Sequence, residues 1–193
     1  AVMNRLILVK HSSPQIEKNK PAREWKLSPE GKVRAGRLAK ELAKYHPRKV
    51  YSSAELKARE TAGIIADKLG LSYQVADNLQ EHDRRFAPYV SEVEFQSLAR
   101  RLFENPDQQV FGEETGSQAL RRFCGSIENL TQHETTDTLV VVSHGTVISL
   151  YAEWLTGCDG YTLWKELGLP SYIVFDPQRK TIDHIGNLEE GKS

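Results

Sequence analysis

The chain has 193 residues, with 26 basic and 26 acidic side chains, so its formal net charge is zero when histidine is neutral. This length favours one domain, and 39% hydrophobic with 27% charged residues is typical of a globular protein rather than a disordered one. Nucleic-acid-binding proteins usually carry a basic excess, so the neutral balance argues against such a partner. A local anion site stays open, because net charge does not say where the charges lie.

The sequence also lacks membrane and export signals. No segment approaches the roughly 20 apolar residues of a transmembrane helix, and the N-terminus has no basic-then-apolar signal pattern. The two cysteines, Cys124 and Cys158, have neither CxxC spacing nor companions for a disulfide framework, although two cysteines are able to pair. We therefore expect a reduced, cytoplasmic protein with no membrane partner. The oligomeric state is not predicted.

Apolar runs alternate with segments of helical periodicity along the chain. Six short apolar runs predict strands, at residues 6–9, 49–51, 73–76, 138–142, 171–175 and 181–185. A first helix is predicted to follow the N-cap Ser28, and its last apolar position is Ala43. Further helices are predicted at 55–69, 91–103, 117–130 and 147–155. This alternation predicts an α/β fold, a three-layer sandwich with a mainly parallel central sheet and helices on both faces. The segment 79–116 fits poorly, and we expect it to be a cap inserted over the strand C-terminal edge of a single domain, 1–193.

Three predicted strands end in polar residues with reactive side chains. His11 follows the first strand and His144 follows the fourth. The second strand ends in Ser52-Ser53. The carboxyl ends of parallel strands share one edge of the sheet, where ligands bind, so we expect His11 and His144 to converge there. Gly145 allows close approach of a ligand, and the helix after it begins with free N–H groups.

Two lysines accompany these histidines. Lys10 precedes His11, and Lys57 lies in the first turn of the helix after the serine pair. Imidazole and ammonium groups gathered at one edge would form an anion pocket, for which phosphate is the natural occupant. A neutral imidazole is a nucleophile toward phosphorus, and neighbouring cations favour its neutral form while stabilising the transferring phosphoryl oxygens. The departing alcohol needs a proton donor, and a carboxylic acid with a raised pKa suits that role.

Five segments in order carry a family resemblance: Leu8-Val9-Lys10-His11-Ser12, Leu27-Ser28-Pro29-Glu30-Gly31, the block from Val50 to Ala62, Leu79-Gln80-Glu81 and Val141-Val142-Ser143-His144-Gly145. The first resembles the Arg-His-Gly signature of the histidine phosphatase superfamily, also called phosphoglycerate mutase-like. The next two resemble its Leu-Thr-x-x-Gly and Ser-Ser-x-x-x-Arg-Ala-x-x-Thr-Ala elements. The last two resemble its acidic proton-donor region and its second His-Gly signature. Each motif alone is weak, whereas the ordered set is specific and spans most of the chain.

The resemblance implies a role for each residue at these positions. His11 would be the nucleophile that becomes a phosphohistidine, and His144 would contact the transferring phosphoryl group. Lys10 and Lys57 take the positions of the two phosphate-clamping arginines. Glu81 would be the acid/base.

The chain departs from the family at three positions. Both clamping arginines are lysines, and Ser12 replaces the signature glycine. Arginine holds phosphate through a planar bidentate fork, whereas lysine is a flexible point charge, so charge is kept and geometry is lost. The leading hypothesis is a phosphomonoester hydrolase that acts on a small phosphorylated substrate through a phosphohistidine. The alternatives are a catalytically weak or inactive relative that binds a phosphorylated ligand or partner, and a phosphoglycerate mutase-type phosphotransferase, which the resemblance implies would be longer.

Simpler structural interpretations of these residues remain alongside the functional ones. Either histidine alone is more simply a strand-end structural residue, and the serine pair offers a cap for the following helix. Glu81 has His82, Asp83 and Glu113 as neighbouring competitors. Trp25, Trp154 and Trp164 are interpreted as packing anchors. Arg84 and Arg85 belong to a polar cluster that either reaches over the pocket or is simply solvated.

Two other hydrolase classes are disfavoured. The sequence around His144 has no GxSxG elbow, which argues against a serine hydrolase. A metal hydrolase built from His11, His144, Glu81 and Asp83 is conceivable, but HExxH and close ligand spacing are absent. We therefore expect neither a metal nor another cofactor.

Overall fold

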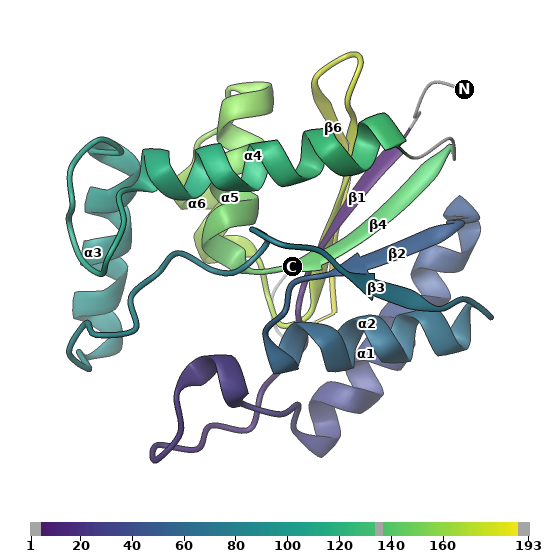
Figure 1. The fold of residues 1–193 in the computed structure, drawn as a ribbon, viewed down its shortest axis with the longest axis horizontal. Coiled ribbons are helices and arrows are strands. Elements are labelled where there is room, and N and C mark those ends of the chain that lie inside the picture. Colours follow the sequence, from purple (N-terminus) through teal and green to yellow (C-terminus); the bar gives the residue numbers. More distant parts are fainter. Residues whose placement is uncertain (1–4, 134–136, 189–193) are drawn as a thin grey trace.

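A six-stranded sheet in the order β3-β2-β4-β1-β5-β6 forms the centre of the computed structural model, which describes residues 5–133 and 137–188 (Figure 1). The strands are β1 (Arg5–Lys10), β2 (Lys49–Ser52), β3 (Tyr73–Val75), β4 (Thr138–Ser143), β5 (Ser171–Asp176) and β6 (Thr181–Asn187). The first four strands pair in parallel, and β5 and β6 pair antiparallel. The predicted α/β fold with a mainly parallel sheet is therefore confirmed, with an antiparallel hairpin at one side.

Six α-helices and two short 3-10 helices connect the strands in the described residues. They are η1 (Ala22–Glu24), α1 (Pro29–Leu42), η2 (Ala43–Tyr45), α2 (Leu56–Lys68), α3 (Glu92–Glu104), α4 (Gly116–His133), α5 (Gly145–Thr156) and α6 (Gly160–Glu166). The Ser28 side chain accepts the N–H of Gly31 at the start of α1, as its N-cap pattern predicts. The sequence analysis misses α6, because seven residues are too few for a periodic signal.

Alternate residues of the central strands pack into two separate cores. Leu6 and Leu8 belong to the core beneath α4 and α5, whereas Ile7 and Val9 belong to the core beneath α1 and α2. Successive side chains of a strand point to opposite faces, so a run that is apolar throughout requires cover on both faces. Figure 1 shows these helix pairs on opposite sides of the sheet, which gives the three predicted layers.

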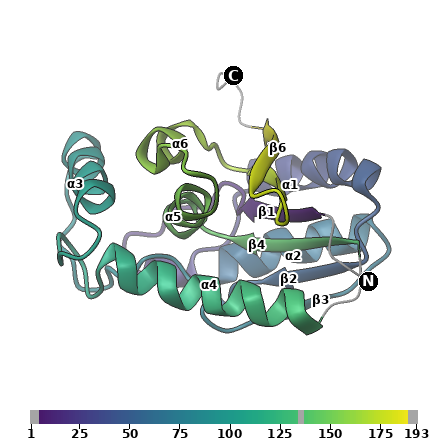
Figure 2. The ribbon, with the colours of Figure 1, turned by 90° about the horizontal axis from the view of Figure 1, so that it is seen from above.

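The segment 79–116 departs from this layered pattern. It passes the carboxyl end of β4, where Ser143 Oγ donates a 2.6 Å hydrogen bond to the Leu79 carbonyl. Residues 76–91 form neither helix nor strand and lead to α3, which lies beside α6 and away from the sheet (Figure 2). The path of this segment brings its first residues over the strand edge that carries the two histidines.

Two further observations concern the cysteines and the helices. Cys124 and Cys158 are both free thiols, and burial raises the pKa of Cys124 to about 11. Within residues 5–133 and 137–188, no helix combines the length and apolar character that a membrane crossing requires.

The core beneath α4 gives a test of the packing. Phe123 is fully buried and meets the Tyr151 ring at a centroid distance of 5.7 Å. We expect Phe123→Ala to lower the free energy of unfolding by about 3–5 kcal/mol, because it removes apolar contact and leaves a cavity. Urea unfolding measures the change. Phe86→Ala is the control, since Phe86 is 79% exposed and its loss should change stability by less than about 0.5 kcal/mol. Equal effects of the two substitutions would contradict the packing.

Candidate active site

Strand register brings the two predicted histidines together. Lys10 of β1 lies opposite Ser143 of β4, so His11 and His144 leave neighbouring strands at the same edge. The His11 N–H donates to the Ser143 carbonyl at 3.1 Å, and the two imidazole centroids are 5.2 Å apart in an edge-on arrangement. The convergence expected from the strand ends is present in the structure.

The His11 side chain has a defined tautomer. Its Nδ1 lies 2.8 Å from the Ser12 carbonyl oxygen, which can only accept, so Nδ1 carries the proton and Nε2 keeps its lone pair. Burial lowers the pKa of His11 well below its ordinary value, and the charges of His144 and Lys57 lower it further. The imidazole is therefore neutral, with a free nucleophilic nitrogen.

The loop after β1 is held by hydrogen bonds to residues of two other motifs that resemble those of the family. The Ser12 N–H donates to Thr61 Oγ1 in α2, and the Ser12 hydroxyl donates to the Gly31 carbonyl in α1. A Cβ at Gly31 would lie 2.2 Å from the Ser13 carbonyl oxygen, so this approach requires glycine. Helices α1 and α2 thus hold the backbone that orients His11.

His144 is bonded to a carboxylate that the sequence analysis does not single out. Its Nε2 lies 2.9 Å from Glu55 Oε2 and 2.8 Å from Ser53 Oγ. Glu55 Oε2 also accepts the Glu81 N–H at 3.0 Å, and Oε1 lies 3.6 Å from Lys57 Nζ. Burial alone would raise the pKa of Glu55, but His144 and Lys57 hold it well below its ordinary value. Ser53 thus contacts His144, and the N-cap position of α2 belongs to Glu55 and not to a serine.

Glu81 lies at the N-terminus of α5. Its carboxylate accepts the N–H groups of Thr146 at 3.0 Å and Val147 at 3.2 Å, and Arg84 Nη2 lies 3.8 Å away. Burial alone would raise the pKa of Glu81, but Arg84, His144 and these backbone donors lower it to about 2. The raised pKa expected for a proton donor is therefore wrong for the ligand-free site, because the carboxylate occupies a helix N-terminus beside a cation.

The two lysines lie on different sides of the histidines. Lys10 Nζ donates to the Leu167 carbonyl at 2.9 Å, and a Cβ at Gly145 would lie only 3.2 Å from it. Lys57 is 8% exposed, donates to the Ala22 carbonyl at 3.2 Å and lies over the Trp25 ring, 5.6 Å from its centroid. Glycine at position 145 thus makes room for Lys10, and Trp25 packs against the second lysine.

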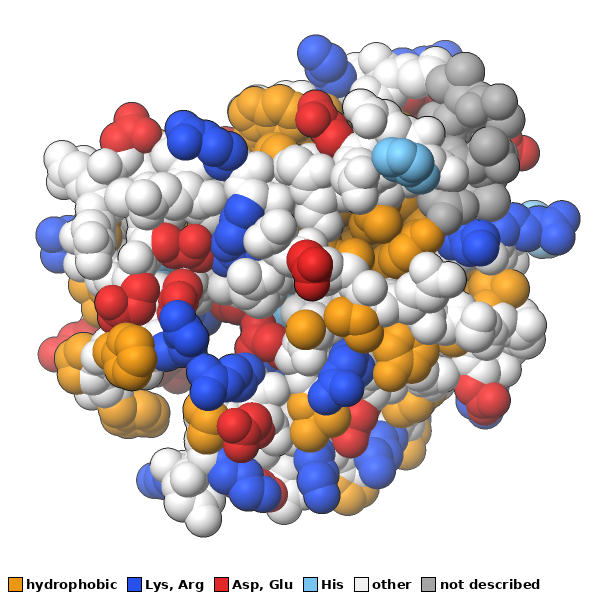
Figure 3. All heavy atoms as spheres, in the orientation of Figure 1, with side chains coloured by type: hydrophobic (Ala, Val, Ile, Leu, Met, Phe, Trp, Pro, Cys, Tyr) orange, Lys and Arg blue, Asp and Glu red, His pale blue; other side chains and the backbone are white. Residues whose placement is uncertain are grey.

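A cavity of about 490 Å³ opens beside this cluster. Its lining includes Lys57, Glu55, Glu81 and Arg84, and Figure 3 shows the face hollowed here with acidic and basic side chains around the opening. His144 is 1% and His11 8% exposed, and neither is among the described residues that line the cavity. Glu55, which lines the cavity, contacts His144 directly.

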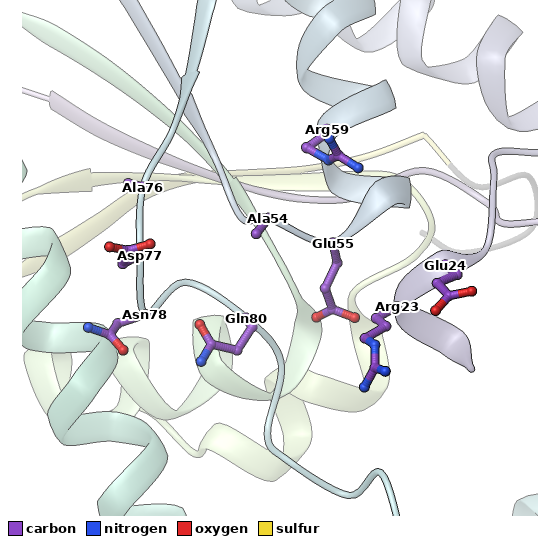
Figure 4. A pocket seen from close by; sticks show the side chains of 9 residues that line it. All are labelled: Arg23, Glu24, Ala54, Glu55, Arg59, Ala76, Asp77, Asn78 and Gln80. Atoms are coloured by element: carbon purple, nitrogen blue, oxygen red, sulfur yellow. The ribbon is translucent and has the colours of Figure 1, made fainter. Parts of the chain in front are cut away.

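A second cavity, of about 670 Å³, adjoins the first. Arg23, Glu55 and Gln80 line both, and Figure 4 shows them with Asp77 and Arg59 around the shared space. Its described lining lacks Lys57 and Glu81, which both line the first cavity, so we assign the chemistry to the first cavity.

Arg122 of α4 holds the segment that carries Glu81. Its guanidinium donates to the carbonyls of Asn78, Gln80 and Glu81 at 3.2, 2.7 and 2.9 Å, and it pairs with Glu114 at 2.6 Å. One side chain thus satisfies backbone groups of a segment with no ladder of its own. No motif marked Arg122 in the sequence, because its partners are distant along the chain.

The family model for the Histidine phosphatase superfamily (branch 1) matches residues 6–187. The chain belongs to the histidine phosphatase superfamily. Phosphoserine phosphatase 1 from Hydrogenobacter thermophilus is 29% identical to this histidine phosphatase over 171 residues, 84% of this chain and 81% of that relative.

Solved structures share the fold at lower identity. A mutant phosphoserine phosphatase from Entamoeba histolytica in complex with phosphoserine has a TM-score of 0.78 at 17% identity, covering 97% of this chain and 98% of that one. A mycobacterial glucosyl-3-phosphoglycerate phosphatase has a TM-score of 0.73 at 19% identity, covering 89% of each chain. At such identities the likeness shows the fold alone.

The competitors of Glu81 have other partners in this histidine phosphatase, although His82 and Asp83 line the same cavity. His82 is buried, and its Nε2 is hydrogen-bonded to the Glu114 carbonyl. The Arg85 guanidinium donates to both carboxylate oxygens of Asp83, and Glu113 is exposed. Among the residues that the structure describes, no group of three or more His, Cys, Asp or Glu side chains is arranged to hold a metal ion.

The contacts of Glu55 generate a prediction. Its carboxylate interacts with His144, with Lys57 and with the Glu81 backbone N–H. We expect an incoming anion to bind the same groups. We expect Glu55→Gln to bind inorganic phosphate at least about tenfold more tightly, because it removes a negative charge from the anion site. Calorimetric titration with phosphate measures this affinity.

Glu24→Gln is the matched control for that titration. Glu24 lines the second cavity with Glu55 but is exposed, so the same charge change there should alter phosphate affinity by less than about threefold because solvent screens it. Equal affinities in the two variants would contradict the occupation of the anion site by Glu55.

Proposed function

We propose that the protein hydrolyses small phosphomonoesters through a phosphohistidine formed on His11. The free Nε2 lone pair of a neutral, buried imidazole at the strand edge is the observation that carries this proposal. Membership of the superfamily supports the same chemistry. The names of the relatives mention phosphoserine and glucosyl-3-phosphoglycerate, which supports a substrate with a carboxylate near the phosphate ester.

The first step transfers the phosphoryl group. His11 Nε2 attacks phosphorus, the P–O bond to the alcohol breaks, and Glu81 gives the leaving oxygen a proton. Lys10, Lys57 and His144 stabilise the charge on the transferring oxygens. We propose that the two lysines stand in for the clamping arginines of the family, supplying charge without the bidentate fork.

Glu81 must gain its proton when substrate binds. In the ligand-free site its pKa is about 2, so it is ionised. A bound phosphate brings negative charge next to this carboxylate, and a like charge raises a carboxyl pKa. In the second step Glu81 takes a proton from water as the water attacks the phosphohistidine, which releases inorganic phosphate and restores His11.

The proposal also covers the domain organisation of the protein and its cytoplasmic location. We propose that residues 79–116 act as a cap on a single domain, with Arg122 holding the base of the cap. The free thiols support the cytoplasmic location.

The second candidate is a catalytically weak relative that binds a phosphorylated ligand or partner. It is favoured by one observation, namely that Glu55 and Glu81 already occupy the anion-binding groups beside His144 and at the start of α5. Hydrolysis ranks first because the same contacts leave His11 Nε2 free.

The test of the proposal is a phosphoenzyme experiment. We expect wild-type protein to turn over substrates in a panel of phosphomonoesters and to carry an acid-labile phosphoryl group after rapid quench, with no loss of activity in EDTA. His11→Ala should abolish both signals because it removes the nucleophile. His184→Ala is the control, since His184 is exposed on β6 away from the site. A phosphoenzyme that survives His11→Ala, or a wild type with neither signal, would overturn the proposal.

Lys57 distinguishes the two candidates. Lys57→Met should lower kcat/KM by about 100-fold, because it removes a charge that faces the transferring group. Lys57→Arg should keep kcat/KM within about tenfold of wild type, because the charge remains. Steady-state kinetics on the best substrate measures both. A gain of about 100-fold in Lys57→Arg would instead favour the second candidate, whose native pocket is built to bind.

A further inference from the structure

Arg84 lies on the wall of the catalytic cavity, next to Glu81. The Glu81 carboxylate accepts the backbone N–H groups of Thr146 and Val147, and Arg84 Nη2 approaches the same carboxylate at 3.8 Å. This separation is too long for a hydrogen bond, so the pair is held by charge alone. Arg84 therefore lies next to the acid on the wall of the cavity.

Two aromatic rings fix the Arg84 guanidinium. It lies over the Phe95 ring at 4.6 Å from the centroid and near the Phe111 ring at 5.7 Å. Cation–π contact on planar faces restricts the orientation of the guanidinium and reduces the entropy that a ligand would have to remove. The cap thus presents Arg84 as a preoriented group rather than a solvated one.

One nitrogen of this guanidinium lacks a partner. Arg84 Nη1 is buried without a hydrogen bond, and no side-chain hydrogen bond of Arg84 occurs among the described residues. A guanidinium offers five N–H donors, and leaving them unsatisfied in a partly buried site is unfavourable. Nη1 is therefore a buried donor that an anionic ligand would satisfy.

The neighbouring Arg85 shows that an arginine of this segment can be hydrogen-bonded within the protein. Its Nε and Nη2 donate to the two oxygens of Asp83 at 3.0 and 2.9 Å, and its side chain is 56% exposed. The neighbouring arginine is thus satisfied within the protein, whereas Arg84, at 28% side-chain exposure, is not.

We propose that Arg84 is a specificity residue that binds a carboxylate on the alcohol portion of the substrate. The inference rests on the proposed function, in which Glu81 marks the position of the ester oxygen. A group on the cavity wall next to Glu81 would then meet the alcohol portion of the substrate. A planar guanidinium fork matches the two oxygens of a carboxylate, which a single point charge does not.

Binding of a substrate carboxylate to Arg84 would also change the pKa of Glu81. A substrate carboxylate that neutralises Arg84 removes a cation that lowers the pKa of Glu81, and so favours the protonated form that the first step needs. The preferred substrate would thereby assist its own hydrolysis.

Phosphoserine and phosphoethanolamine test the proposal, since they differ by one carboxylate. We expect wild type to prefer phosphoserine in kcat/KM, and Arg84→Met to lower this preference by about 10- to 100-fold, mainly through KM. Methionine keeps volume between the two phenylalanine rings, and an effect of the substitution on Glu81 that both substrates share cancels in the ratio. Arg84→Lys keeps the charge without the fork and should lose part of the preference. Arg85→Met is the matched control and should leave the ratio within about twofold.

The same comparison is made without turnover. In a His11→Ala background, calorimetry gives the dissociation constants of both compounds, and Arg84→Met should remove the tighter binding of phosphoserine. If His11-intact enzyme fails to turn over either compound while this binding preference depends on Arg84, the specificity inference stands and the hydrolase proposal fails. If turnover occurs but neither the kinetic nor the binding ratio changes in Arg84→Met, the specificity inference is overturned and hydrolysis stands.

Discussion

The parallel register of β1 on β4 is the constraint on which the site depends. Because Lys10 lies opposite Ser143, the residues that follow, His11 and His144, leave the sheet at one level and bring their rings to 5.2 Å. The start of α5 follows at once, so its free N–H groups enter the same space. A register shift of one residue would turn every apolar side chain of β1 to the other face, so the two buried cores lock this geometry.

The site balances charges that the neutral composition hides. Lysines and imidazoles gather at the strand edge as its anion-binding groups, and Glu55 and Glu81 lie against them as internal anions. The two carboxylates offset the positive charge of the cluster, which explains how buried cations are tolerated here. A phosphate must then displace or add to resident carboxylates, and its charge supplies the change that Glu81 needs to become an acid. Binding and acid formation are coupled by the same electrostatics.

Sequence reasoning located the residues that strand ends and motifs mark. His11 and His144 were predictable because an apolar run of four residues that stops at a polar residue gives both the strand and its end. Glu55 and Arg122 were not, because their importance lies in contacts across the chain, to His144 and to the carbonyls of 78, 80 and 81. The pKa direction of Glu81 was also beyond reach, since it depends on the start of α5 and on Arg84. The short helix α6 carries too few residues to show a period.

Histidine-selective ¹⁵N NMR of the ligand-free protein tests the central claim, that His11 is held neutral with Nε2 free, most directly. The structure predicts a His11 ring that stays neutral well below its ordinary titration range, with the proton on Nδ1, because burial and neighbouring charges lower its pKa and the Ser12 carbonyl accepts from Nδ1. A His11 ring that titrates at its ordinary pH of about 6.5 would contradict the burial of the ring among cations, and a proton on Nε2 would contradict the free nucleophilic lone pair.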